Sequence, residues 1–340
     1  MRPRLRIVLA TEGPRLPAER LLAQPSGGVE LALAMLVRAL ARAGHAVTVL
    51  AGTAPDETDG DGVVWAASTT GPADLVIANR APKLFWRLPR GPRVLWLHNP
   101  ARYLRKPRHA VPLLLARPRI VVLGPSHSAT LPAFFAGRAL EIPLAVAPPF
   151  DAGGTARPPP GPRAVFASNP LRGLDALLGL WAARILPAVP DATLHVFAGA
   201  GVYGDDAKLA ARVAPVLERA AHTPGVVLRG PQTRAVLAHE YGRARAMLYL
   251  GDAGETFCLA VAEAQAVGLP CVLGAAGAQA ERLRDGQTGI LAADHDAFVA
   301  GAIRLLRDDA AWASLHAGAI ARGPGADWAA VASRFVALAR

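Results

Sequence analysis

The chain has 340 residues, of which 52% are hydrophobic and 19% charged, and its formal net charge is +11. This length is enough for two domains with ordinary cores, and the composition indicates a globular rather than a disordered chain. Two cysteines, Cys258 and Cys271, exclude a disulfide framework and favour a cytoplasmic location, and no apolar run predicts a signal peptide or a membrane span.

Positive charge is concentrated in the first half of the chain. Residues 1–150 contain 19 Lys and Arg against 9 Asp and Glu, whereas residues 151–340 contain 18 against 17. Between Arg80 and Arg119 there are 11 basic residues and no acidic one, and the prolines at 100, 107, 112 and 118 predict a looped or broken segment. We expect this segment to meet an anionic membrane surface or an anionic or lipid-linked acceptor. A solvated face without a partner is the alternative, and no nucleic-acid-binding module accompanies the charge.

The beginning of the chain predicts a strand, a helix and a strand. Leu5 to Ala10 is an apolar run, Gly27 and Gly28 open a helix that reaches Arg42, and Ala46 to Leu50 is the next strand. The two glycines fit either a ligand-binding loop or a plain turn before the helix.

Three further strands are expected in this half, and polar residues follow two of them. The strands are predicted at Asp74 to Ala78, Arg93 to His98 and Ile120 to Leu123. His98 ends its strand at the edge where open α/β sheets bind ligands, although a structural role is the alternative. Ser126, after the third strand, is predicted to cap a helix.

A proline-rich segment gives the clearest break, and alternating strands and helices follow it. Gly153 to Pro162 predicts a semi-rigid linker, and we assign residues 1–150 and 151–340 to an N-terminal and a C-terminal domain. The later strands are expected at 164–167, 193–198 and 226–229, and the later helices at 208–221, 234–243, 296–307 and 327–338.

The turn from Gly199 to Gly204 fits the dinucleotide fingerprint G-x-G-x-x-G. Asp205 and Asp206 would repel a pyrophosphate at this place, so an NADP-dependent oxidoreductase is the less favoured interpretation.

The segment from Met247 to Leu273 predicts a strand, a loop, a helix capped by Thr256 and a second strand. Glu255 lies in the loop and Glu263 two turns into the helix, where helical geometry turns its side chain back toward Glu255. The N–H groups near Phe257, Cys258 and Leu259 suit a phosphate. Alternatively, Glu255 is an exposed acid of the first turn and Glu263 a solvated helix residue.

These glutamates belong to a longer pattern. Seven residues separate them, a small-Gly-x-Pro turn follows, and then come Gly274, Gly277, Glu281, Asp285, Gly286 and Gly289. The pattern resembles retaining glycosyltransferases of family 4. The resemblance implies the GT-B fold, in which two Rossmann-like domains with parallel sheets face a central cleft. It implies that the N-terminal domain serves the acceptor and the C-terminal domain the nucleotide-sugar donor, with the last helix packing on the N-terminal domain.

The resemblance also implies site residues. Glu255 would contact the donor sugar, Glu263 the ribose, Arg172 before Gly173 the phosphates, and His98 the sugar from the other domain. The remaining donor-binding candidates are Gly27, Gly28, Gly199, Gly230, Thr256, Phe257, Cys258 and Leu259. A second arginine expected shortly before Arg172 is absent, since Ala167 or a neighbour stands there.

No metal or other cofactor is expected. The chain offers no Asp-x-Asp loop for a metal–diphosphate complex, and its nearest match, Asp294-His-Asp296, is predicted to start a helix. Two alternatives on the same fold stay open: a nucleotide-sugar epimerase and a non-catalytic binding subunit.

Overall fold

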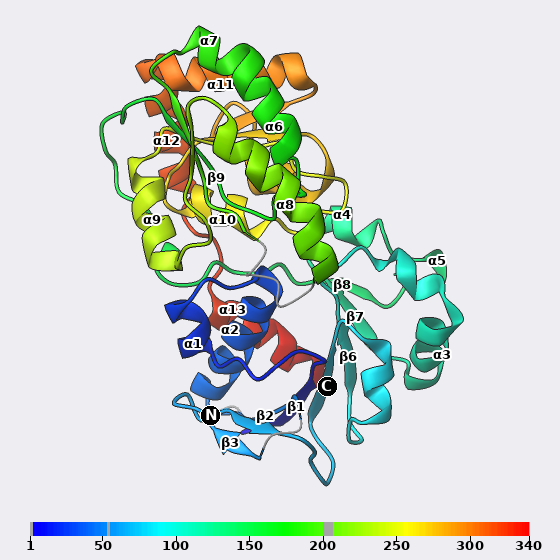
Figure 1. Ribbon diagram of the computed structural model, residues 1–340. Coiled ribbons are helices and arrows are strands. Elements are labelled where there is room, and N and C mark those ends of the chain that lie inside the picture. The colour runs from blue at the N-terminus through cyan, green and yellow to red at the C-terminus, as the bar shows by residue number, and fades with distance from the viewer. Residues whose placement is uncertain (1–2, 53–54, 200–206, 340) are drawn as a thin grey trace. The chain divides into compact units, whose positions relative to one another are not determined.

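The computed structural model describes residues 3–52, 55–199 and 207–339 (Figure 1). The contacts of the chain divide it into two compact units. Unit 1 comprises Met1–Leu21, Gly28–Ala145 and Ala326–Arg340, and unit 2 comprises Leu22–Gly27 and Val146–Gly325. Each unit is built on a parallel sheet, which confirms the predicted α/β fold with two Rossmann-like halves.

The sheet of unit 1 has eight strands in the order β3-β4-β2-β1-β5-β6-β7-β8, and only β3 runs antiparallel to its neighbour. Residues 7–10 of β1 are all buried, as expected where helices cover both faces of a parallel sheet. The strands are β1 (Arg6–Ala10), β2 (Ala46–Leu50), β3 (Glu57–Thr58), β4 (Val64–Ala66), β5 (Leu75–Asn79), β6 (Arg93–Trp96), β7 (Arg119–Val122) and β8 (Ala139–Glu141).

Helix α13 belongs to unit 1 although it comes from the end of the chain. It packs against α2, and Figure 1 shows the red α13 beside the blue α2. The ring of its Phe335 lies edge-on to that of Trp96, with 5.3 Å between the centroids. The helices of unit 1 are α1 (Ala18–Ala23, whose last two residues belong to unit 2), α2 (Gly28–Arg42), η1 (Pro82–Trp86), η2 (Ala101–Arg105), α3 (Pro107–Ala116), α4 (Pro125–Ser128), α5 (Ala133–Ala136), α13 (Trp328–Val336) and η7 (Ala337–Ala339).

The sheet of unit 2 has six parallel strands in the order β11-β10-β9-β12-β13-β14. They are β9 (Arg163–Phe166), β10 (Thr193–Val196), β11 (Val226–Leu228), β12 (Ala246–Tyr249), β13 (Cys271–Gly274) and β14 (Gly289–Ala292). The helices are η3 (Phe150–Ala152), α6 (Leu174–Leu180), the π-helix η4 (Trp181–Ile185), α7 (Leu186–Ala188), α8 (Ala207–His222), α9 (Arg234–Arg243), α10 (Leu259–Ala266), η6 (Gly277–Arg282), α11 (His295–Arg307) and α12 (Asp309–Arg322).

The proline-rich segment 153–162 is not a free linker, because it packs on unit 2. A Cβ at Gly154 would lie 2.4 Å from the backbone carbonyl of Val267. The guanidinium of Arg157 donates to the carbonyl of Tyr241 at 3.2 Å and lies 5.6 Å above the ring of Trp312. The sequence shows proline's stiffness but not what the segment packs against.

Two predicted caps are wrong, and a third is confirmed. Gly124 rather than Ser126 precedes α4, so Ser126 lies inside the helix. Cys258 rather than Thr256 precedes α10, which therefore begins three residues after Thr256. Asp294 does start α11, where its Oδ1 accepts a hydrogen bond of 2.8 Å from the N–H of Ala297.

In the described ranges, no helix is both long and apolar enough to cross a bilayer. Both cysteines are buried thiols.

Candidate functional site

The loop between β12 and α10 carries the candidate donor site in unit 2. Gly251 has φ +67°, and a Cβ there would lie 2.2 Å from the side-chain nitrogen of Gln279, so only glycine fits without displacement. At the other end of the loop Cys258 has φ +63°, a left-handed conformation that is costly for a residue with a side chain. This turn keeps Thr256 out of the helix.

Glu255 is held in this loop by two side chains. It is 4% exposed, and its Oε1 accepts hydrogen bonds from Arg172 Nη1 at 2.8 Å and from the hydroxyl of Tyr249. Burial raises the pKa of Glu255 above its usual value, while the guanidinium of Arg172 and the hydrogen bond from Tyr249 act in the opposite direction. The alternative of an exposed first-turn acid is wrong.

Arg172 reaches Glu255 because two glycine turns approach each other closely. Gly173 has φ +85°, and a Cβ there would lie 3.0 Å from both the carbonyl oxygen of Gly251 and the Cβ of Leu250. The turn before α6 therefore rests on the loop after β12. The side chain of Arg172 stays 41% exposed, and its Nε lies 3.9 Å from Asp252. An exposed guanidinium beside a buried carboxylate is well placed to meet an anionic ligand.

Glu263 forms a separate buried ion pair. Its partner is Arg234, the first residue of α9, and the two residues are 4% and 7% exposed. Burial lowers the pKa of Arg234 to about 10. The alternative of a solvated Glu263 is therefore wrong. No pattern in the sequence pointed to Arg234 as its partner, because an ion pair between two helices depends on how they pack.

The start of α10 lies beside a second guanidinium. Phe257 and Cys258 are both 5% exposed, and the guanidinium of Arg282 lies 4.2 Å above the ring of Phe257. Arg282 also forms an ion pair with Glu281 at 3.0 Å. The N–H groups of a first helical turn have no partner within the helix and carry the positive end of its dipole. Arg282 was not predicted, although it stands in the recognised pattern directly after Glu281.

Two glycine turns of unit 2 lie next to each other. A Cβ at Gly199 would lie 2.6 Å from the ring of Pro231, and the neighbouring Gly230 has φ +67°. The rest of the predicted dinucleotide fingerprint, together with Asp205 and Asp206, lies outside the described residues.

The predicted residues Gly28 and His98 belong to unit 1. Helix α2 begins at Gly28, directly after Gly27. His98 follows β6 and is 5% exposed, and its ring centroid lies 4.3 Å from that of Trp96. Burial lowers the pKa of His98 well below 6.5, and Arg80 and His127 lower it further, so its imidazole is neutral at pH 7.

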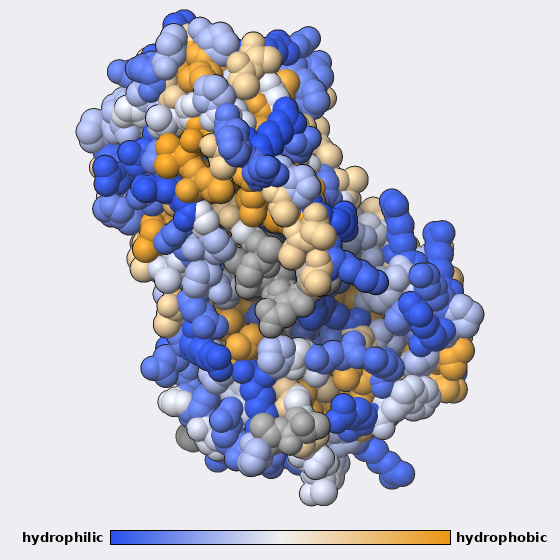
Figure 2. Space-filling model, viewed as in Figure 1, coloured by the Kyte–Doolittle hydropathy of each residue, from blue (hydrophilic) through white to orange (hydrophobic). Residues whose placement is uncertain are grey.

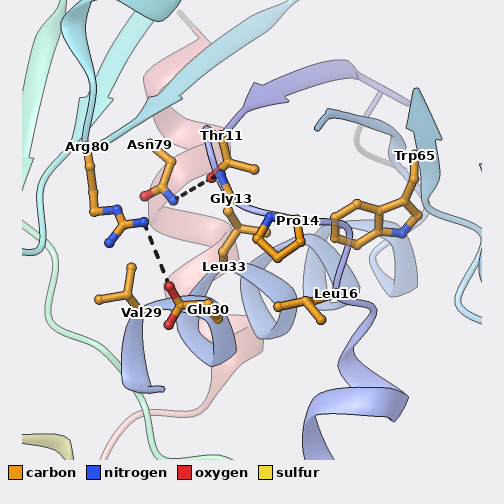
Figure 3. A pocket seen from close by; sticks show the side chains of 10 residues that line it. All are labelled: Thr11, Gly13, Pro14, Leu16, Val29, Glu30, Leu33, Trp65, Asn79 and Arg80. Carbon is orange, nitrogen blue, oxygen red and sulfur yellow. Dashed lines mark hydrogen bonds and ion pairs between the residues drawn. The ribbon is translucent and has the colours of Figure 1, made fainter. Parts of the chain in front are cut away.

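A small pocket that opens to solvent lies in unit 1 near the ends of β1 and β5 (Figure 3). Arg80 has φ +64°, and its Nη2 lies 3.8 Å from Glu30. Asn79 donates to Oγ1 of Thr11 at 3.3 Å, and in the described part of the chain its buried Oδ1 has no hydrogen-bond partner. The lining residues are Thr11, Gly13, Pro14, Leu16, Val29, Glu30, Leu33, Trp65, Asn79 and Arg80.

The pocket was not predicted. Asn79 ends a strand at the edge where ligands bind, which was an available signal, but the left-handed Arg80 could not be inferred. The structure fixes this conformation by two backbone hydrogen bonds, one to the carbonyl of Trp96 at 2.8 Å and one from the hydroxyl of Tyr103 at 2.7 Å.

No group of three or more His, Cys, Asp or Glu side chains that could hold a metal ion occurs within 3–52, 55–199 and 207–339. The aspartates of the nearest Asp-x-Asp match are engaged elsewhere. Asp294 caps α11, and Asp296 forms an ion pair with Arg184 at 2.6 Å.

Known proteins resemble this chain in sequence and in fold. The family described as Glycosyl transferases group 1 matches residues 162–308. A D-inositol 3-phosphate glycosyltransferase of Catenulispora acidiphila is 37% identical over 103 residues, which make up 30% of this chain and 25% of that protein. The match thus spans about a quarter of that relative.

Solved structures match over nearly the whole chain. Sucrose-phosphate synthase from Thermosynechococcus elongatus has a TM-score of 0.73 at 17% identity, covering 96% of both chains. HepE from Anabaena, in complex with UDP-glucose, has a TM-score of 0.69 at 15% identity and covers 98% of both. Trehalose 6-phosphate synthase from Burkholderia multivorans has a TM-score of 0.72 at 14% identity, and the match covers 99% of this chain and 98% of the other. The chain therefore has the GT-B fold, and its residues 162–308, which hold Arg172, Glu255 and Glu263, match the family described as Glycosyl transferases group 1.

Proposed function

We propose that the protein transfers a sugar from a nucleotide-sugar to an acceptor, with retention of configuration at the anomeric carbon. The observation that carries this proposal is the pair formed by Arg172 and Glu255, a guanidinium that is partly exposed and a carboxylate that is buried. It lies inside the segment that matches the glycosyl transferase family, and one structural relative is described in complex with UDP-glucose.

Unit 2 would bind the donor. Arg172, Arg282 and the N-terminus of α10 supply positive charge for a diphosphate. We propose that Arg282 takes the role of the second phosphate-binding arginine that is absent before Arg172. Glu255 would accept hydrogen bonds from the sugar and Glu263 from the ribose, each oriented by its own arginine.

In the reaction, the bond between the anomeric carbon and the phosphate oxygen breaks, and a bond to the acceptor oxygen forms on the same face of the sugar. The acceptor's proton passes to the leaving diphosphate, since no side chain of the proposed site is assigned as the base. Fixed arginines near the diphosphate would stabilise the negative charge that develops there. Neutral His98 would act as a hydrogen-bond partner of the sugar and not as a cation.

Unit 1 would bind the acceptor. Oδ1 of Asn79 offers a hydrogen-bond acceptor for a hydroxyl group in the pocket of Figure 3, and Arg80 offers a cation beside it. We propose that the acceptor is anionic or lipid-linked and is met at the cytoplasmic face of a membrane, where the basic segment 80–119 would attract it.

Thermal unfolding in the presence of UDP, GDP, ADP and their sugars tests the proposal. One nucleotide at 100 times its dissociation constant adds about 2.7 kcal/mol to the free energy of unfolding. Release of that nucleotide from its sugar, accelerated by an acceptor, supports transfer. Isomerised donor without an acceptor indicates an epimerase, and binding without turnover indicates a binding subunit. Stabilisation by NADPH alone would contradict the proposal.

A further inference from the structure

Helix α3 turns hydrophobic side chains away from the core of unit 1. Val111, Leu114 and Leu115 lie at positions i, i+3 and i+4, on one face of the helix, and are 48%, 52% and 65% exposed. The neighbouring Leu113 is fully buried, which shows that α3 covers its core with a different face. The outward side chains are therefore only partly packed against unit 1.

Trp86 extends this surface. It ends η1, against which α3 packs, and it is 62% exposed. The other five tryptophans are all buried. We call Trp86, Val111, Leu114 and Leu115 the α3–Trp86 surface. Hydrophobic side chains that gather on one exposed surface mark an interaction site more often than singly scattered ones.

The chain segment that carries the α3–Trp86 surface is rich in exposed basic side chains. Of the 11 basic residues between Arg80 and Arg119, all except Arg80 and Arg93 are exposed, and no acidic residue occurs in this range. Four of them lie within seven residues in η2 and the start of α3: Arg102, Arg105, Lys106 and Arg108. Figure 2 shows hydrophobic atoms among hydrophilic ones at the right-hand edge, where Figure 1 places α3.

We infer that the α3–Trp86 surface docks unit 1 on an anionic lipid bilayer. Tryptophan and leucine side chains enter the boundary between headgroups and acyl chains, while Arg and Lys side chains face the anionic headgroups. A continuous negative surface suits a segment with basic residues and no acidic ones, because the surface repels none of the segment's own side chains. The inference rests on the proposed function only in that a lipid-linked acceptor would be met there.

Tryptophan fluorescence gives a test that reports on this surface, since Trp86 alone among the tryptophans is exposed. The purified full chain is titrated with vesicles of about 30% phosphatidylserine in phosphatidylcholine and with vesicles of phosphatidylcholine alone. We expect a blue shift of the emission with the anionic vesicles that is lost in Trp86→Phe. Half a molar salt should weaken binding at least tenfold. An equal emission shift with both kinds of vesicle, or no binding to either, would overturn the inference. An acidic protein would then be the partner to test.

Two variants separate the contributions of hydrophobic contact and of charge to vesicle binding, and a third variant is the control. Leu114→Gln with Leu115→Gln removes hydrophobic contact, and Arg102, Arg105, Lys106 and Arg108 changed together to Gln remove charge. Each should weaken vesicle binding at least tenfold. The control changes four exposed arginines of unit 2, Arg212, Arg243, Arg304 and Arg307, to Gln and alters the net charge equally. The control should bind vesicles like the wild type. If it lost as much binding as the variant of unit 1, net charge alone would explain the binding.

Failure of this inference differs from failure of the proposed function. Vesicle binding requires no turnover, so Glu255→Gln should bind vesicles normally. The variants of the α3–Trp86 surface should keep the nucleotide affinity of unit 2.

Discussion

Arg172 donates a hydrogen bond of 2.8 Å to Glu255 although the two residues lie 83 positions apart in the chain. Two glycine turns bring them together, Gly173 before α6 and Gly251 after β12, and at both places a side chain would collide with the other turn or with Gln279. The carboxylate is buried and the guanidinium is partly exposed. The ion pair therefore orients a cation toward the position proposed for the donor diphosphate.

Replacing Arg172 by Gln should lower kcat by about 100- to 1,000-fold, because one preorganised hydrogen-bond donor to developing charge is removed. It should also move the acidic limb of the pH profile of kcat/KM to higher pH. Arg172 opposes the rise that burial causes in the pKa of Glu255, so without it Glu255 becomes protonated at higher pH.

The matched control is Arg219→Gln. Arg219 forms an exposed ion pair at 2.6 Å with Asp175, which lies in α6, the helix that follows Arg172. Its loss should change neither kcat nor the pH profile. Identical kinetics in both variants would contradict the role of Arg172.

Much of this site could be predicted from the sequence because its residues are close together in the chain. The spacing of Glu255 and Glu263 is a local pattern, and so is the Arg172-Gly173 pair, so all three side chains could be identified from it. Their ion pairs could not be predicted, since the partners of Glu255 and Glu263 come from α-helices or turns that packing alone brings near. The cap at Thr256 was wrong because a good capping residue does not reveal the left-handed turn at Cys258.

The helices and strands, like the site, could be predicted only in part from the sequence. Strands β1, β5 and β12 were predicted because parallel strands are continuous apolar runs. The short β3 and β8 were missed because edge strands of two or three residues leave no such run. Helix α12 was missed even though Asp308 caps it, and α3 forms through Pro112 where a broken segment was expected.

Replacing Glu263 by Met should destabilise the protein by about 3–5 kcal/mol, because Arg234 would remain buried without its partner. Changing Arg234 to Met as well should recover part of this loss. Urea unfolding measures the free energy of unfolding of the single and the double variant. A double variant as unstable as the single one would contradict the argument.

Glu263→Gln and Glu255→Gln should differ in their kinetics. If Glu263 binds ribose equally in ground and transition states, its change raises the KM for the donor. Glu255→Gln should lower kcat instead, because the transferred sugar is the proposed partner of Glu255. Wild-type kinetics in both variants would contradict the assignment of Glu255 and Glu263 to the donor site.

The free energy of unfolding should fall as the pH drops from about 7.5 to about 5.5. Burial lowers the pKa of His98 well below 6.5 and that of His195 to about 4, so the unfolded chain binds more protons in this window. Glu255, whose pKa is raised, acts in the opposite direction but is a single group. His195→Gln should reduce the slope, whereas His222→Gln, an exposed control, should leave it unchanged. A stability that rises as the pH falls through this window would contradict the argument.

Activity should persist in excess EDTA. Arg172, Arg282 and the helix N-terminus are proposed to supply the positive charge that a divalent ion would otherwise provide. Initial rates with and without chelator test this, and loss of activity that Mn²⁺ restores would contradict it.

The central claim is that unit 2 binds a nucleoside diphosphate through Arg172 at the Glu255 loop. Isothermal titration of UDP, GDP and ADP into the wild type, Arg172→Gln and Arg219→Gln tests it most directly. We predict that at least one of the three binds the wild type and Arg219→Gln with equal affinity and Arg172→Gln at least tenfold more weakly, a difference of about 1.4 kcal/mol. Absence of binding by all three nucleotides, or equal binding by all three proteins, would contradict it.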